Sequence, residues 1–233
     1  MTLAGVLSGT SLSAEEKIKV PADVQAGVTA KTHLLQAQKF AQFGMHQDAI
    51  IEFKKSLEAL PDFVDAHFEL GQVYANIDRH DDAIREYKKT LELEPHHNKV
   101  VYELALAYYD TNMTDEGIEL CKFYLKDNDP GKANLHSLLG VLYIKKGDTD
   151  RAVSEFRKQL EANHHPEQGY LNLGMALMKK GETDEAIESY KKSLELFPRN
   201  PRTHYQLGAA YKSKGMYEEA EKEMAEYRGL VGR

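Results

Sequence analysis

The segment EQGYLNLGMALMKKGETDEAIESYKKSLELFPRN, residues 167–200, predicts two helices that fold back on each other. Gly181 separates the two halves, and Pro198 ends the second helix. Apolar side chains recur at helical spacing in each half; they are Leu171, Leu173, Leu177 and Met178, then Ala186, Ile187, Tyr190, Leu194 and Phe197. Because neither helix can bury its apolar stripe alone, this unit requires neighbours of the same kind.

Copies of this unit fill most of the chain with a period of 34 residues. They lie at 30–63, 64–97, 98–131, 133–166 and 201–233, with one inserted residue, Lys132, between the third and fourth copies. Small residues recur in two columns, the first comprising Ala37, Gly71, Ala105, Gly140, Gly174 and Gly208, the second Ala49, Ala83, Gly117, Ala152, Ala186 and Ala220. With this period and these columns, the units resemble tetratricopeptide repeats. The resemblance implies an all-α solenoid of tetratricopeptide-repeat helical hairpins, wound as a right-handed superhelix.

The recurring residue types can also be explained by packing and backbone geometry, without reference to the family. Where helix backbones cross closely, a larger side chain in the small columns would be overpacked at a cost of about 1–3 kcal/mol. Aromatic residues fill the space between helices; in the second helices they are Phe53, Tyr87, Phe156 and Tyr190, with Cys121 and Met224 as substitutes. The turn between paired helices carries residue types that accept a left-handed backbone: Gly44, Asp78, Asn112, Gly147, Gly181 and Gly215. The family's usual tryptophan is replaced throughout, by His33, His67, Val101, His136, Tyr170 and His204.

Composition excludes several classes of function. The 233 residues carry a net charge of −7, and no run approaches the ~20 apolar residues that cross a bilayer. The negative charge argues against nucleic acid as a ligand, because phosphate binding requires a coherent basic face. The single cysteine, Cys121, occupies a core column and is expected to pack as a small hydrophobic residue. No integral membrane segment is expected.

Motifs for catalysis or metal binding are not found in the sequence. The recurring histidines are a whole helical hairpin apart, too far to share one zinc ion with its bonds of about 2.0–2.1 Å. The chain has no phosphate-binding glycine loop, no Gly-x-Ser-x-Gly and no His-Glu-x-x-His. We therefore expect no enzyme activity, no cofactor and no metal.

The two ends of the chain depart from the repeat. Residues 1–20 are predicted to be an N-terminal arm or the remnant of a secretory signal, and residues 21–233 a single solenoid domain in which Ala22 to Phe43 form one long helix. Cytoplasmic location is favoured, and export is expected if the true start lies upstream of Met1. In the last repeat Glu221 and Arg228 replace columns that are otherwise Ile or Val and Leu, which predicts a C-terminal cap. The inserted residue and Pro130-Gly131 predict a hinge at 127–133.

With no catalytic or metal-binding motif in the sequence, the function is expected to lie in the surface of the repeat array. First helices line the concave side of such a stack, and the repeat phase predicts a mostly apolar groove formed by Leu34, Gln38, Phe68, Gln72, Tyr102, Leu106, Tyr109, Ser137, Val141, Ile144, Leu171, Met175, Met178 and Tyr205. Some family members bind acidic chaperone tails through a clamp of Lys, Asn and Arg. At the positions where such a clamp would begin, this chain has Leu34 and Gln38, Phe68 and Gln72, or Tyr102 and Leu106, so that clamp is missing.

Two interpretations of this surface stay open. In the first, the protein is a non-enzymatic scaffold or adaptor that holds a segment of a partner protein in the groove and helps to assemble a complex. In the second, it is a structural protein that self-assembles into homo-oligomers, coats or filaments, with the N-terminal segment or a repeat face of one copy docking into the next.

Overall fold

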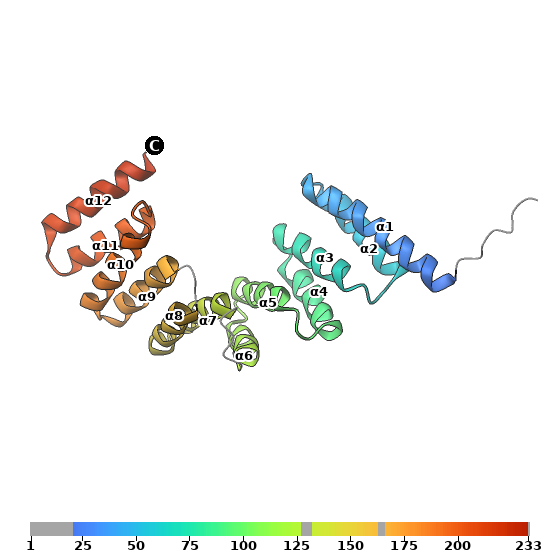
Figure 1. Ribbon diagram of the computed structural model, residues 1–233, viewed down its shortest axis with the longest axis horizontal. Helices are drawn as coiled ribbons and strands as arrows, with labels where there is room; N and C mark the ends of the chain where they lie inside the picture. Colours follow the sequence, from blue (N-terminus) through green and yellow to red (C-terminus); the bar gives the residue numbers. More distant parts are fainter. Residues whose placement is uncertain (1–20, 127–131, 163–165, 233) are drawn as a thin grey trace, which may run out of the picture.

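The protein is an open arc of helical hairpins in the computed structural model, which describes residues 21–126, 132–162 and 166–232 (Figure 1). Within these ranges there are helices and no strands, so the expected all-α solenoid is confirmed. The helices are α1 Ala22–Gln42, α2 His46–Ala59, α3 Val64–Asn76, α4 His80–Leu93, α5 Asn98–Asp110, α6 Thr114–Tyr124, α7 Ala133–Lys146, α8 Thr149–Ala162, α9 Pro166–Lys180, α10 Thr183–Leu196, α11 Pro201–Ser213 and α12 Tyr217–Val231. Each odd-numbered helix pairs with the helix that follows it.

Two features expected from the sequence fall largely outside the described ranges. They are the N-terminal arm at 1–20 and the hinge at 127–133, of which only Lys132 and Ala133 are described. Both stay predictions, as does the division into an arm and one solenoid domain. The long first helix is present, because α1 begins at Ala22, directly after Pro21, and runs to Gln42.

The turns within the hairpins have the backbone that their residue types predict. Positive φ angles occur at Gly44, Asp78, Asn112, Gly147, Gly181 and Gly215, with values between 59° and 89°. At Asp78 the φ is 59° and at Asn112 it is 61°, in the left-handed region that these two residues tolerate best after glycine. The predicted turn column is therefore confirmed in all six hairpins.

Three glycines of the first column of small residues, Gly71, Gly140 and Gly174, face an aromatic ring, whereas Gly208 faces Met224 and the backbone oxygen of Ala220. A Cβ atom added to Gly71 would lie 2.6 Å from the Tyr87 ring, and one added to Gly174 would lie 2.5 Å from the Tyr190 ring. Each ring comes from the second helix of the same hairpin and is fully buried. The ring thus rests directly on the glycine backbone of the first helix, and this contact sets the distance between the two helices.

The apolar core runs along the arc in two clusters that meet at α5. One face of α5 packs against α3 and α4 through Val100 and Leu104, and another packs towards α7 through Val101 and Ala105. No single centre exists, as expected for a repeat array in which each unit contacts only its neighbours. Figure 1 shows α5 and α7 on the inner side of the arc and α6 and α8 on its outer side.

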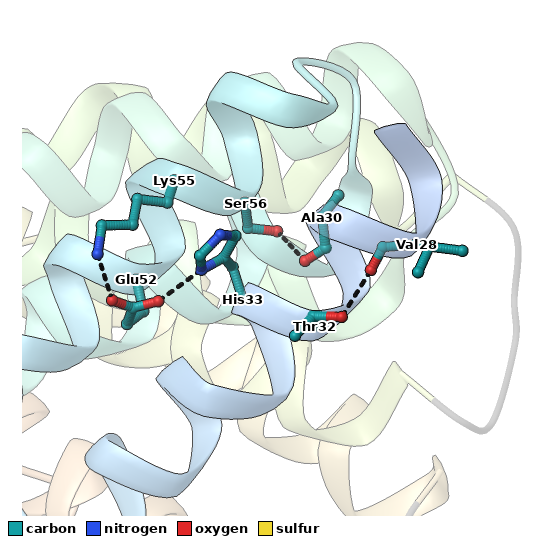
Figure 2. Close-up of polar contacts among 7 residues, drawn as sticks. All are labelled: Val28, Ala30, Thr32, His33, Glu52, Lys55 and Ser56. Atoms are coloured by element: carbon teal, nitrogen blue, oxygen red, sulfur yellow. Dashed lines mark hydrogen bonds and ion pairs between the residues drawn. The ribbon is translucent and has the colours of Figure 1, made fainter. Parts of the chain in front are cut away.

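A repeated histidine–glutamate pair links the two helices of four hairpins. Figure 2 shows it in the first hairpin, where His33 Nδ1 lies 2.6 Å from a Glu52 carboxylate oxygen and Lys55 Nζ lies 2.7 Å from the other oxygen. The same contact, at 2.6–2.7 Å, joins His67 to Glu86, His136 to Glu155 and His204 to Glu223. The histidine always comes from the first helix and the glutamate from the second, 19 residues later. These polar contacts occupy the place that tryptophan usually fills.

The protonation of His67 is set by its position between two acceptors. Its Nδ1 lies 2.7 Å from Glu86, and its Nε2 lies 2.9 Å from the carbonyl oxygen of Pro61. Both ring nitrogens therefore have to donate, which only the imidazolium form does. Burial lowers the pKa of His67, but the bonds to Glu86 and Pro61 outweigh it, so the pKa is raised above its ordinary value of 6.5.

Glu155 shows the complementary effect. Burial raises the pKa of this carboxyl, but the bonds that it accepts from His136 and Lys158 outweigh burial, so the pKa lies below its ordinary value of 4.5. The bonds from His136 and Lys158 therefore favour the charged form of Glu155.

Candidate functional site

Two cavities lie along the first helices, on residues that the repeat phase had assigned to a groove. The larger, about 430 Å³, opens between α3, α5 and the start of α7. Phe68 and Tyr102 form its aromatic wall, and Gln72, Asn98 and Asn134 line it with side-chain amides. This mixture of an apolar wall and amide donors and acceptors suits an extended polypeptide, which presents both side chains and unpaired backbone groups. We call it the aromatic pocket.

The second cavity, about 300 Å³, lies further along the array, over α5, α7, α9 and α11. Tyr109, Val141, Ile144 and Met175 form its apolar floor. Asn172 contributes an amide, whose Nδ2 donates to Ser137 Oγ at 3.2 Å. We call this cavity the methionine pocket.

Most of the predicted groove residues are partly exposed. Gln38, Phe68, Gln72, Tyr102, Leu106, Tyr109, Ser137, Val141, Ile144, Met175 and Met178 are half-buried, and Tyr205 is 45% exposed. Half-burial arises because one side of each apolar residue packs against the core while the other faces out of the helix. Phe68, for example, packs its ring 5.0 Å from the His97 ring, centroid to centroid. These side chains therefore contribute both to the core and to the surface.

Leu34 and Leu171 were assigned wrongly to the groove. Leu34 is 5% exposed and Leu171 is fully buried, so neither side chain is available to a partner. Both occupy the column in which Phe68, Tyr102 and Tyr205 are partly exposed. A leucine is short enough to be covered entirely by its neighbours there, whereas the longer aromatic side chain extends past them into solvent.

Half-buried carboxyl groups lie in the N-terminal part of the groove. In the N-terminal part, Gln38 Nε2 donates to a Glu69 carboxylate oxygen at 2.7 Å, linking α1 to α3. Burial raises the pKa of Glu69, with Asp65 adding to the effect and Gln38 opposing it, and burial also raises the pKa of Glu103, which lines the aromatic pocket. Half-buried carboxyls with raised pKa values gain from a donor that reaches them, so a partner's amide or cation would be stabilised here.

A third cavity, about 420 Å³, lies at the C-terminal end. The Tyr205 and Tyr227 rings are 5.4 Å apart, centroid to centroid, and line a shallow cavity with Asn200 and Arg202. Nearby on α12, Glu221 and Arg228 form an ion pair with each other, and both side chains are exposed. Their capping role stays a prediction.

The histidine–glutamate pairs were missed in the sequence, although a signal for them was present. Histidine occurs in the tryptophan column of four repeats, and in each of these the residue 19 positions later is glutamate. The two repeats without the histidine have Val101 with Leu120 and Tyr170 with Ser189, so both partners change together. Such paired change between repeats of one chain indicates direct contact.

Among the described residues, no group of three or more His, Cys, Asp or Glu side chains is arranged to hold a metal ion. Cys121 is buried, and burial raises the pKa of its thiol to about 12. None of the helices in the described part of the chain has the length and apolar content needed to cross a membrane.

Family models match three parts of the chain. Residues 64–97 and 135–169 each match a model described as tetratricopeptide repeat, and residues 174–215 match one described as TPR repeat. The chain is a tetratricopeptide repeat protein. A comparison with curated protein sequences gives no match.

Solved structures of other tetratricopeptide repeat proteins resemble this one in fold. A tetratricopeptide repeat protein from Parabacteroides merdae superposes with a TM-score of 0.76 at 17% identity, covering 88% of this chain and 80% of the other. PilW, a type IV pilus biogenesis factor, gives a TM-score of 0.74 at 15% identity, covering 87% and 94%. YrrB, described as a TPR protein with an unusual peptide-binding site, gives 0.58 at 20% identity, covering 76% and 91%. Tetratricopeptide repeat proteins are in general scaffolds for protein–protein interaction and are typically non-enzymatic.

Proposed function

We propose that this protein is a non-enzymatic scaffold that holds a segment of a partner protein along the first-helix groove and so helps to assemble a larger complex. The observation that carries the proposal is the continuous row of half-exposed apolar and aromatic side chains on α3, α5, α7 and α9, which line both the aromatic pocket and the methionine pocket. A row of this kind is costly to leave in water unless a partner covers it.

Energetics support a contact of useful strength. Full burial of one large apolar side chain contributes about 1.5–3 kcal/mol, and a half-buried one retains roughly half of that to be gained on binding. Several such residues together offset part of the association cost of about 4–15 kcal/mol, and hydrogen bonds from the pocket amides add to them. A net favourable contact therefore requires that the bound segment cover several of these side chains at once.

The resemblance to YrrB agrees with this proposal. The name of that structure attributes a peptide-binding site to the same fold, with a TM-score of 0.58 to this chain. The two chains share the solenoid, and the proposed ligand of this protein is likewise a polypeptide segment.

A display library of random peptides, panned against the full chain, tests the proposal. We expect wild-type protein to enrich peptides that the double variant Phe68→Ala with Tyr102→Ala does not retain. The matched control is Phe123→Ala with Tyr217→Ala, which removes two aromatic side chains that are 59% and 69% exposed on second helices. It should retain the peptides.

Two results would overturn the proposal. If the groove variant and the control retain the same peptides, the groove is not the binding surface. If Phe68→Ala with Tyr102→Ala abolishes the helical circular dichroism, these side chains act as core. Both outcomes would remove the proposed site.

A second candidate function, self-assembly, is favoured by the uncovered face of α1. Val24, Val28 and Leu35 are 48%, 56% and 57% exposed, and their spacing of four and seven residues places them on one side of the helix. A second copy docking there would bury this face. Light scattering on wild-type protein and on Val28→Lys with Leu35→Lys tests this: oligomers that the variant abolishes support self-assembly, and a wild-type monomer at all concentrations excludes it.

A further inference from the structure

The cations around the methionine pocket differ from the other cations at the same helix ends. Lys145 and Lys179 are the penultimate residues of α7 and α9, and Arg202 is the second residue of α11. Lys145 Nζ lies 4.1 Å from the centroid of the Tyr109 ring and donates to the carbonyl oxygen of Tyr109. Lys179 Nζ donates to the carbonyl oxygen of Ile144 at 3.2 Å. These contacts with neutral groups hold the charges beside the pocket.

Arg202 completes the set. Its Nη2 lies 3.6 Å from Met175 Sδ, at the apolar floor. Among the described residues, none of the three cations forms an ion pair with a carboxylate, and no acidic side chain lines the pocket. The observation is therefore one of place: three cations lie beside one apolar pocket whose lining contains no carboxylate.

The lysines next to Lys145 and Lys179 form ion pairs with carboxylates. Lys146 pairs with Asp115 at 2.6 Å, and Lys180 pairs with Asp150 at 2.9 Å. Each follows Lys145 or Lys179 directly in the sequence, yet it points to a carboxylate on a neighbouring second helix. Stabilisation of helix C-termini by positive charge applies to both members of each pair, so it does not explain why only one lacks a carboxylate.

We propose that the methionine pocket is the specificity-determining part of the groove, and that it takes an apolar side chain of the partner segment flanked by aspartate or glutamate. This inference rests on the proposed function, because it names the chemistry of the segment that the groove holds. The apolar side chain enters between Val141, Ile144 and Met175. The flanking carboxylates accept hydrogen bonds from Lys145, Lys179 and Arg202.

The donors needed for these bonds are free. An ammonium group has three N–H donors and a guanidinium has five, so one bond to a carbonyl oxygen or a contact with sulfur leaves others available. A hydrogen bond between a cation and a carboxylate is about twice as strong as a neutral one. The Asn172 amide, which also lines the pocket, is positioned to bond the backbone of the bound segment.

The same display library supplies the test, read through the sequences of the enriched peptides. We expect peptides in which an apolar residue stands beside Asp or Glu. Binding of a synthetic peptide of this composition, followed by fluorescence anisotropy, should weaken about tenfold in Lys145→Gln with Lys179→Gln, equivalent to about 1.4 kcal/mol. The control, Lys146→Gln with Lys180→Gln, removes the same charge from adjacent positions and should change the affinity less than about twofold.

Each other outcome decides against a stated claim. If the enriched peptides depend on Phe68 and Tyr102 but show no preference for acidic residues, the inference is refuted. The proposed scaffold function is unaffected by that result. An equal loss of affinity in the two lysine variants also refutes the inference, because the effect is then one of net charge. If wild-type protein enriches no peptide that the Phe68→Ala with Tyr102→Ala variant loses, the proposed function fails and the inference fails with it.

Discussion

Replacement of Gly174 by alanine tests the packing that fixes the shape of the array. The added Cβ would lie 2.5 Å from Cε1, 2.7 Å from Cδ1 and 3.0 Å from Cζ of Tyr190. Carbon atoms normally pack at about 3.5–4.0 Å, so the ring has to move by roughly 1 Å. The Tyr190 side chain is fully buried, so the ring can move only by displacing the side chains packed around it.

The expected magnitude follows from two opposing effects. Overpacking of a core costs about 1–3 kcal/mol, and exchange of glycine for alanine inside a helix stabilises it by up to about 1 kcal/mol. Because the contact is shorter than those normally seen and involves a rigid ring, we expect overpacking to prevail. The free energy of unfolding should fall by about 1–2 kcal/mol, which is measured by urea denaturation followed by circular dichroism.

A matched control and a rescue make this result specific. Gly229 lies in α12 with no atom within 4 Å of an added Cβ, so Gly229→Ala should be neutral or slightly stabilising. In the third repeat, the equivalent positions are Ala105 and Cys121, both fully buried. Introducing that pair as Gly174→Ala with Tyr190→Cys should cost less than the sum of the two single changes. If Gly174→Ala is as stable as wild type, the ring contact does not set the helix spacing.

Three further predictions concern protonation, reactivity and the end of the array. Because the folded-state pKa of His67 is raised above 6.5, its contribution to stability is fully present below pH 6.5 and is lost as the pH rises through the folded-state value. Glu86→Gln should therefore reduce the loss of stability seen between pH of about 6 and 9 in urea titrations, and an unchanged pH profile would contradict this role. The Cys121 thiol, with its pKa raised to about 12, should react with a thiol reagent at pH of about 8 only after unfolding, and rapid reaction of the native protein would show that it is accessible. Replacement of Glu221 by Ile and Arg228 by Leu should expose an apolar end and produce oligomers in light scattering; a monodisperse species of wild-type size at high concentration would exclude the capping role.

The sequence by itself determined the repeat and its local structure. The 34-residue period, the helix pairs and the six left-handed turn positions all follow from residue types whose conformational preferences act over a few neighbouring residues. The assignment of Phe68, Tyr102, Tyr109 and Met175 to one face also came from the sequence, because the position of a residue within the repeat fixes the side of the helix on which it lies.

The tertiary structure alone decided how deep each side chain lies and what it contacts. Leu34 and Leu171 share a column with Tyr205, yet the first two are buried and the third is 45% exposed, because neighbouring hairpins cover the short leucines while the longer tyrosine extends past them. Lys145 and Lys146 are adjacent and chemically identical, but one reaches a carbonyl oxygen beside the methionine pocket and the other reaches Asp115. Such contacts join residues more than 30 positions apart, and only the packing of successive hairpins brings them together.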